Sequence, residues 1–234
     1  MAHSGFRRDP AAANSEAVED YAKAIYALAD RQDGPVGTSA LAERLGVSPG
    51  TVTAMLKRLD ELGLVRYQPY HGVTLTAAGD RVALEVIRHH RLIEAFLAED
   101  LEMPWDRVHD EAEVLEHYIS EDLERLIADK LGNPKLDPHG DPIPTPELAM
   151  ATDRTTALAR LDAGDIATFA RVSDSDPEML RYLADRGIRP GARLQIVGVE
   201  PFGGPLVVDV EGRKHALGEE LAQKMRVKPV GVNA

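Results

Sequence analysis

Four side chains that commonly bind metal ions lie close together in the segment from His109 to His117. On a helix, residues three and four positions apart share a face, so the spacing predicts one polar stripe. Its members are His109, Glu113, Glu116 and His117. An apolar stripe runs beside it, and charged groups next to a hydrophobic core need a partner, usually a divalent cation. The alternative is a solvated helix face on which the two histidines are incidental.

A second group of the same chemistry lies upstream. His90 and Glu94 are four residues apart in the predicted helix from Asp80 to Leu101, so they share a face. A pair at this spacing is usually a surface pair. Here, however, a break at Met103-Pro104-Trp105 folds the chain back, and we expect His90, Glu94 and His109 to converge.

The chain begins with elements that have to position these groups. Residues 1–15 lack the apolar middle of a secretory signal and predict a disordered leader. Apolar residues then recur at helical spacing from Glu16 to Ala29. Asp20 lies beside this apolar stripe, where an aspartate is ordinarily solvated.

The segment from Thr38 to Val65 predicts a helix-turn-helix. A short helix ends at Gly46, and Ser48 then caps a second helix that has Pro49 at its first position. Small polar residues at the start of the second helix suit entry into the major groove. The segment Leu64–Thr76 follows as a hairpin, which predicts a wing. The candidate DNA contacts are Ser48, Pro49, Gly50, Thr51, Thr53, Lys57 and Arg66; the alternative is an ordinary helical hairpin.

The second half of the chain changes character twice. The segment Val108–Leu131 predicts one helix whose apolar stripe is too long for a small domain to cover, which favours a homodimer. Five prolines between Gly132 and Glu147 predict an extended linker. Short strand-like runs separated by Gly and Pro then predict a small β-barrel.

Composition limits the classes of protein that remain. The 234 residues contain no cysteine and no apolar run long enough to span a membrane, which fits a cytoplasmic protein. The net charge is −12, which argues against non-specific binding of nucleic acid by the whole surface. The segment Thr38–Arg91 nevertheless carries seven Lys/Arg against five Asp/Glu, so a local DNA-facing patch is expected there.

Several motifs together resemble the DtxR/MntR family of metal-dependent transcriptional repressors. They are LAERLGVSPGTVTAMLKRLDELGLV, GVTLTAAG, HHRLIEAFL, VHDEAEVLEH and HGDPIPTP. The resemblance implies a mainly α N-terminal winged helix and a helical dimerisation domain, followed by a small all-β SH3-like domain of the FeoA type. The implied order is a leader (1–15), a winged helix-turn-helix domain (16–80), a dimerisation and metal-sensing domain (81–131), a proline-rich linker (132–154) and the SH3-like domain (155–234).

The resemblance also implies which residues bind metal. Asp20, Glu113, Glu116 and His117 match the family's primary site, and His90, Glu94 and His109 match its ancillary site, giving two sites per subunit. Iron-sensing members resemble this chain but carry sulfur ligands at the positions of Asp20 and Glu113. A further first-helix glutamate of some manganese-type members is Lys23 here, which favours two separate sites. Two C-terminal ligands of the family fall at Ala170 and Ser173, so either Asp174 or Asp176 substitutes or that domain does not bind the metal.

The sequence therefore predicts a Mn(II)-dependent repressor of metal-homeostasis genes that acts as a homodimer on a palindromic double-stranded operator. An Fe(II)-dependent regulator of the same fold, controlling iron uptake, is the nearest alternative. A metallohydrolase would have to explain the upstream helix-turn-helix, and we expect no enzymatic activity. A metal-buffering protein would bind metal without salt-dependent affinity for DNA.

Overall fold

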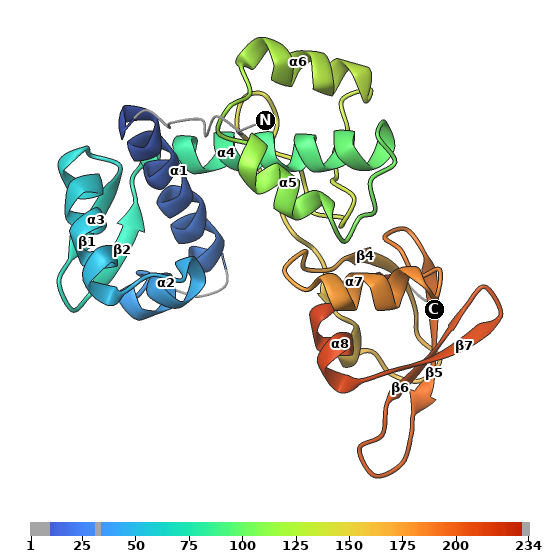
Figure 1. Ribbon diagram of the computed structural model, residues 1–234. Coiled ribbons are helices and arrows are strands. Elements are labelled where there is room, and N and C mark those ends of the chain that lie inside the picture. Colours follow the sequence, from blue (N-terminus) through green and yellow to red (C-terminus); the bar gives the residue numbers. More distant parts are fainter. Residues whose placement is uncertain (1–9, 31–33, 231–234) are drawn as a thin grey trace, which may run out of the picture. The chain divides into compact units, whose positions relative to one another are not determined.

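The computed structural model describes residues 10–30 and 34–230 of the chain (Figure 1). They divide into two compact units. The first holds the chain up to His89 together with Pro144–Ala149, and the second holds His90–Ile143 and the chain from Met150 onward. Among the described residues, no helix combines the length and apolarity that crossing a membrane requires.

The first unit is a three-helix domain with a β-hairpin. Its elements are α1 (Pro10–Ala29), α2 (Thr38–Leu45), α3 (Pro49–Glu61), β1 (Val65–Gln68) and β2 (Gly72–Leu75), followed by the first half of α4 (Ala77–Glu99). Ile25, Leu41 and Leu56 are fully buried in its core. Each comes from a different helix, so α1 packs against both helices of the helix-turn-helix.

Local sequence signals set the helix-turn-helix. Gly46 has a φ of 65°, a left-handed conformation that glycine adopts easily, and it ends α2. Ser48 is extended, and its hydroxyl oxygen accepts a hydrogen bond from the backbone N–H of Thr51 at 3.1 Å. Pro49 occupies the first turn of α3, where no backbone donor is needed.

The hairpin after α3 pairs four residues on each strand. Val65 and Val73 face the core, whereas Arg66 points to solvent. Tyr70, at the tip, has a φ of 69° and is fully exposed. The winged helix predicted from the sequence is therefore confirmed.

The first helix corrects the predicted leader. α1 begins at Pro10, so residues 10–15 of the predicted disordered segment are helical, and residues 1–9 lie outside the described chain. Proline suits a first helical position, and the three alanines after it have the highest helix propensity.

The single helix predicted over residues 108–131 is also wrong. The structure has α5 (Val108–Leu115), a turn, and α6 (Glu121–Lys130). Ser120 is extended, and its hydroxyl oxygen accepts from the backbone N–H of Leu123, which starts α6 afresh. The apolar spacing continues across this break, which is why the pattern suggested one helix.

The C-terminal part of the second unit is the small SH3-like β domain that the sequence predicts. One antiparallel sheet has the strand order β3-β8-β4-β5-β6-β7. Its elements are β3 (Thr156–Ala157), the 3-10 turn η1 (Leu158–Arg160), β4 (Ile166–Arg171), α7 (Pro177–Ala184), β5 (Arg193–Val199), β6 (Leu206–Val210), β7 (Arg213–Leu217), α8 (Glu219–Lys224) and β8 (Arg226–Pro229). The apolar runs in the sequence do not indicate β7, because this polar edge strand buries one residue only. They do not indicate α8 either.

Candidate metal centre and DNA-binding face

Helix α4 presents the first two donors of the metal centre. His90 and Glu94 are one helical turn apart, with His90 Nε2 3.2 Å from Glu94 Oε1. His90 is 4% exposed and Glu94 is fully buried. A glutamate without solvent requires positive charge nearby, so this pair is not the surface pair that the spacing alone would suggest.

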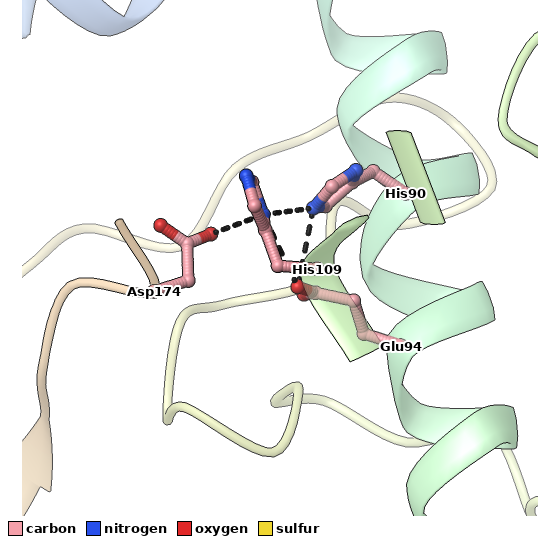
Figure 2. Close-up of side chains that lie close together, drawn as sticks. All are labelled: His90, Glu94, His109 and Asp174. Atoms are coloured by element: carbon pink, nitrogen blue, oxygen red, sulfur yellow. Dashed lines mark hydrogen bonds and ion pairs between the residues drawn. The ribbon is translucent and has the colours of Figure 1, made fainter. Parts of the chain in front are cut away.

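Two further donors complete the group, one from α5 and one from the segment between β4 and α7. His109 Nδ1 lies 3.2 Å from His90 Nε2 and 3.6 Å from Glu94 Oε1. Asp174 Oδ2 lies 3.2 Å from the same His109 nitrogen. Figure 2 shows both histidines next to Glu94, with Asp174 joined to the group through His109.

The electrostatics of this group favour a cation. Burial lowers the pKa of His109, but its contacts with Asp174 and Glu94 outweigh burial and raise that pKa to about 10. Burial raises the pKa of Asp174, but His109 more than reverses this and holds it at about 2. Burial also acts to raise the pKa of Glu94, yet the neighbouring imidazoles keep it well below its usual value. At neutral pH the carboxylates are therefore ionised, and a metal has to replace a proton on His109.

The geometry fits one divalent ion. Donors bound at roughly 2.0–2.6 Å to one cation lie about 3.0–3.6 Å from their neighbours, and the contacts described above fall between 3.2 and 3.6 Å. Both carboxylate oxygens of Glu94 are also buried without a hydrogen-bond partner of good geometry in the described part of the chain. A buried carboxylate of this kind is expected where a cation supplies the missing contacts.

A second set of donors surrounds the end of α5. Glu116 is 1% exposed, and its Oε2 lies 2.5 Å from His90 Nδ1. Glu113 Oε1 lies 3.7 Å from the same His90 nitrogen, and His117 Nε2 lies 3.7 Å from Glu116 Oε1. His90 thus faces Glu94 with one ring nitrogen and Glu116 with the other. The two predicted sets are neighbours that share an imidazole in this arrangement.

Asp20 is half-buried on α1, in the first unit, whereas the donors around α5 belong to the second unit. Its participation in the primary set stays a prediction.

The structure distinguishes the two aspartates proposed for the C-terminal domain. Asp174 contacts His109, whereas Asp176 caps α7 by accepting from the backbone N–H of Met179. Two other buried groups near Glu94, Asp137 and His139, were missed by the sequence reasoning. The available signal was the run Asp137-Pro138-His139-Gly140-Asp141-Pro142, in which ionisable residues lie among prolines.

The candidate DNA contacts lie just before α3, on α3 and on β1 of the first unit. Ser48, Pro49, Gly50, Thr51, Lys57 and Arg66 are exposed, and Thr53 is half-buried. Thr53 and Lys57 also line a surface hollow of about 480 Å³ between the start of α2, helix α3 and the hairpin tip. The small residues at the start of α3 leave room for a groove wall or phosphates beside Lys57.

Comparison with known proteins identifies the family. Models described as the "Iron dependent repressor" N-terminal DNA binding domain, the metal binding and dimerisation domain, and the FeoA domain match residues 14–73, 76–145 and 156–229. The iron-dependent repressor IdeR of Mycobacterium tuberculosis is 33% identical over 227 residues, covering 92% of this chain and 98% of its own. The chain belongs to the DtxR/MntR family of metal-dependent transcriptional repressors.

Other members of this family are also similar, and one of them is named for manganese. The diphtheria toxin repressor of Corynebacterium efficiens is 30% identical over 229 residues, covering 93% of this chain and 98% of its own. A solved structure of a manganese-dependent transcriptional repressor in complex with manganese is 42% identical, with a TM-score of 0.84, over 91% of this chain and all of that one. These relatives are named as repressors, which agrees with the expectation of no enzymatic activity. Iron and manganese both occur among the names, so family membership leaves the metal undecided.

Proposed function

We propose that this protein is a Mn(II)-dependent repressor of metal-homeostasis genes. The observation that carries the proposal is the chemistry of the donors. The groups that lie together around Glu94 and Glu116 are carboxylates and imidazoles, and Mn(II) prefers oxygen donors with some imidazole. Because Mn(II) binds more weakly than later divalent metals, selectivity would have to come from coordination geometry.

The ligands we propose are Asp20, Glu113, Glu116 and His117 for the primary site, and His90, Glu94, His109 and Asp174 for the ancillary site. Apart from Asp20, the donors of the primary site come from α5 and the turn at its C-terminal end. If Asp20 completes the primary set, a cation there also ties down α1, on which the helix-turn-helix packs. Metal would then favour one placement of the reading helix α3.

The proposed active form is a homodimer on a palindromic operator. Its support is an apolar surface on α5 and α6, where Val114, Leu115, Tyr118, Leu123 and Leu126 are 40–56% exposed. Covering these side chains with a second copy would remove them from water, and a dimer carries two α3 helices, one for each half of a palindromic operator. We also propose the domain limits 16–80, 81–131, 132–154 and 155–234.

The test uses a DNA duplex selected from a random-sequence pool with the full-length protein and Mn(II). Fluorescence anisotropy then measures binding of this duplex during a Mn(II) titration. We expect Glu116→Gln to raise the Mn(II) midpoint at least tenfold, and Glu178→Gln, which changes an exposed glutamate on α7, to leave it unchanged. Equal midpoints for Glu116→Gln and wild type would refute the proposed site.

An Fe(II)-dependent repressor is the second candidate, supported by the 33% identity to IdeR. The same titration with Fe(II) under anaerobic conditions separates the two. A manganese repressor binds the duplex at Mn(II) concentrations at which Fe(II) has little effect, and the reverse order would support the iron regulator.

A further inference from the structure

His139 is a fully buried histidine in the segment between α6 and β3, and no role follows for it from the donors described above. Its Nε2 lies 2.7 Å from the backbone carbonyl oxygen of Trp105, and its ring stacks on the Trp105 indole with centroids 5.7 Å apart. A carbonyl oxygen only accepts hydrogen bonds, so Nε2 carries a hydrogen. The other ring nitrogen, Nδ1, then faces Glu94, 3.6 Å from its Oε1.

The predicted extended linker is a closed turn at this point, and the turn fixes the ring. Asp137 Oδ1 accepts from the backbone N–H groups of His139 and Asp141, each at 2.9 Å. Gly140 has a φ of 89°, and a Cβ on it would lie 1.9 Å from the Ala170 carbonyl oxygen on β4. The imidazole is therefore held by its own turn, by Trp105 and by the C-terminal sheet.

Neither His139 Nδ1 nor the Glu94 carboxylate has its hydrogen bonding completed by the contact between them. His139 Nδ1 and both Glu94 oxygens are buried, and within the described chain none has a hydrogen-bond partner of good geometry. A lone pair on Nδ1 would repel the carboxylate at this distance, so a hydrogen on Nδ1 directed at Glu94 is the favourable arrangement. His139 does not belong to the group formed by His90, Glu94, His109 and Asp174, so it reaches the carboxylate from outside that group.

We propose that His139 is a positioning residue of the metal centre: it acts through Glu94 and orients the carboxylate toward His90 and His109. This inference rests on the proposed function, because it needs Glu94 to be a ligand. A separate cation held by Glu94, Asp137 and His139 fits less well. Asp137 Oδ1 already accepts two backbone donors, and its Oδ2 lies 3.6 Å from the guanidinium Nε of Arg91.

Two substitutions test the roles of the two ring nitrogens of His139 separately. In His139→Asn the amide nitrogen takes the place of Nδ1 and can still donate to Glu94, whereas in His139→Gln it takes the place of Nε2 and reaches only Trp105. Groups that orient a metal ligand usually change affinity by about 10–100-fold. Mn(II) affinity is measured on the full-length protein from the electron paramagnetic resonance signal of free Mn(II).

We expect His139→Gln to weaken one Mn(II) site by at least tenfold, and His139→Asn to restore most of the loss. His71→Gln, at the exposed hairpin tip, is the control and should match wild type. If both His139 variants match wild type, or both lose the site equally, the positioning role is wrong. If the wild-type protein does not lower the signal of free Mn(II), the proposed function itself fails.

A measurement on wild type does not depend on how the variants fold. Selectively ¹⁵N-labelled histidine in the Zn(II)-loaded protein reports which ring nitrogens bind metal. We expect coordination shifts for the three proposed histidine ligands, His90, His109 and His117, and none for His139. A coordination shift on His139 Nδ1 would overturn the proposal, because the residue would then bind the metal itself.

Discussion

Replacing Asp174 with asparagine removes a carboxylate that the C-terminal domain brings to the candidate metal centre. The pKa of Asp174 falls from 3.8 to about 2, mainly because His109 outweighs the effect of burial. At about 1.4 kcal/mol per pKa unit, this corresponds to about 2.5 kcal/mol of preference for the ionised form. The side chain is 29% exposed, so solvent screening reduces the expected contribution to about 1–2 kcal/mol.

The sign of the pH dependence follows from the lowered pKa. The stabilisation is fully present above the ordinary aspartate pKa of 3.8 and is lost as the pH falls through about 2. The rise in the pKa of His109 is larger than the fall in the pKa of Asp174, but it also contains the effects of Glu94 and Glu113. The pKa of Asp174 therefore describes the interaction between Asp174 and His109 better. At neutral pH, Asp174→Asn should therefore show its whole effect.

The assay is urea unfolding at neutral pH with a chelator, for Asp174→Asn, His109→Gln and the double variant. We expect a coupling free energy of about 1–2 kcal/mol between the two positions. Asp122→Asn, whose side chain is 89% exposed on α6, is the matched control and should change stability little. In separate titrations, Asp174→Asn should weaken one Mn(II) site about tenfold, the equivalent of about 1.4 kcal/mol. A coupling near zero together with unchanged Mn(II) affinity would refute the reasoning.

Three further predictions concern other parts of the structure. Mn(II) affinity should rise about tenfold per pH unit between about pH 6 and 9, because metal displaces one proton from His109, whose pKa is about 10; calorimetric titrations that find no pH dependence would contradict this. Gly140→Ala should cost about 3 kcal/mol of unfolding free energy in urea, because its Cβ meets the Ala170 carbonyl oxygen, whereas Gly132→Ala, with positive φ in open space, should cost about 1 kcal/mol. Ser48→Ala removes the cap of α3 and should cost about 1 kcal/mol in thermal unfolding, and no change would mean that the cap contributes nothing.

Spacing along a helix predicts some of the donors of the candidate metal centre. The i, i+4 spacing placed His90 beside Glu94, and the Pro104 break indicated that His109 would return to them. The break between α5 and α6 was missed, because apolar periodicity continues through it and the cap at Ser120 is a weaker signal. The resemblance left Asp174, Asp176 or no ligand at all from the C-terminal domain, and only the structure shows that Asp174 contacts His109 whereas Asp176 caps α7.

The sequence by itself determined the parts of this protein that depend on neighbours in the chain. The glycine at 46 and the cap at Ser48 set the helix-turn-helix, since each acts within a few residues. Tertiary structure alone decided that His139 meets Glu94 and that Asp174 meets His109. The approach of His139 depends on the turn at Asp137 and its packing on β4. Both contacts join segments far apart in sequence, and no local spacing encodes such a contact.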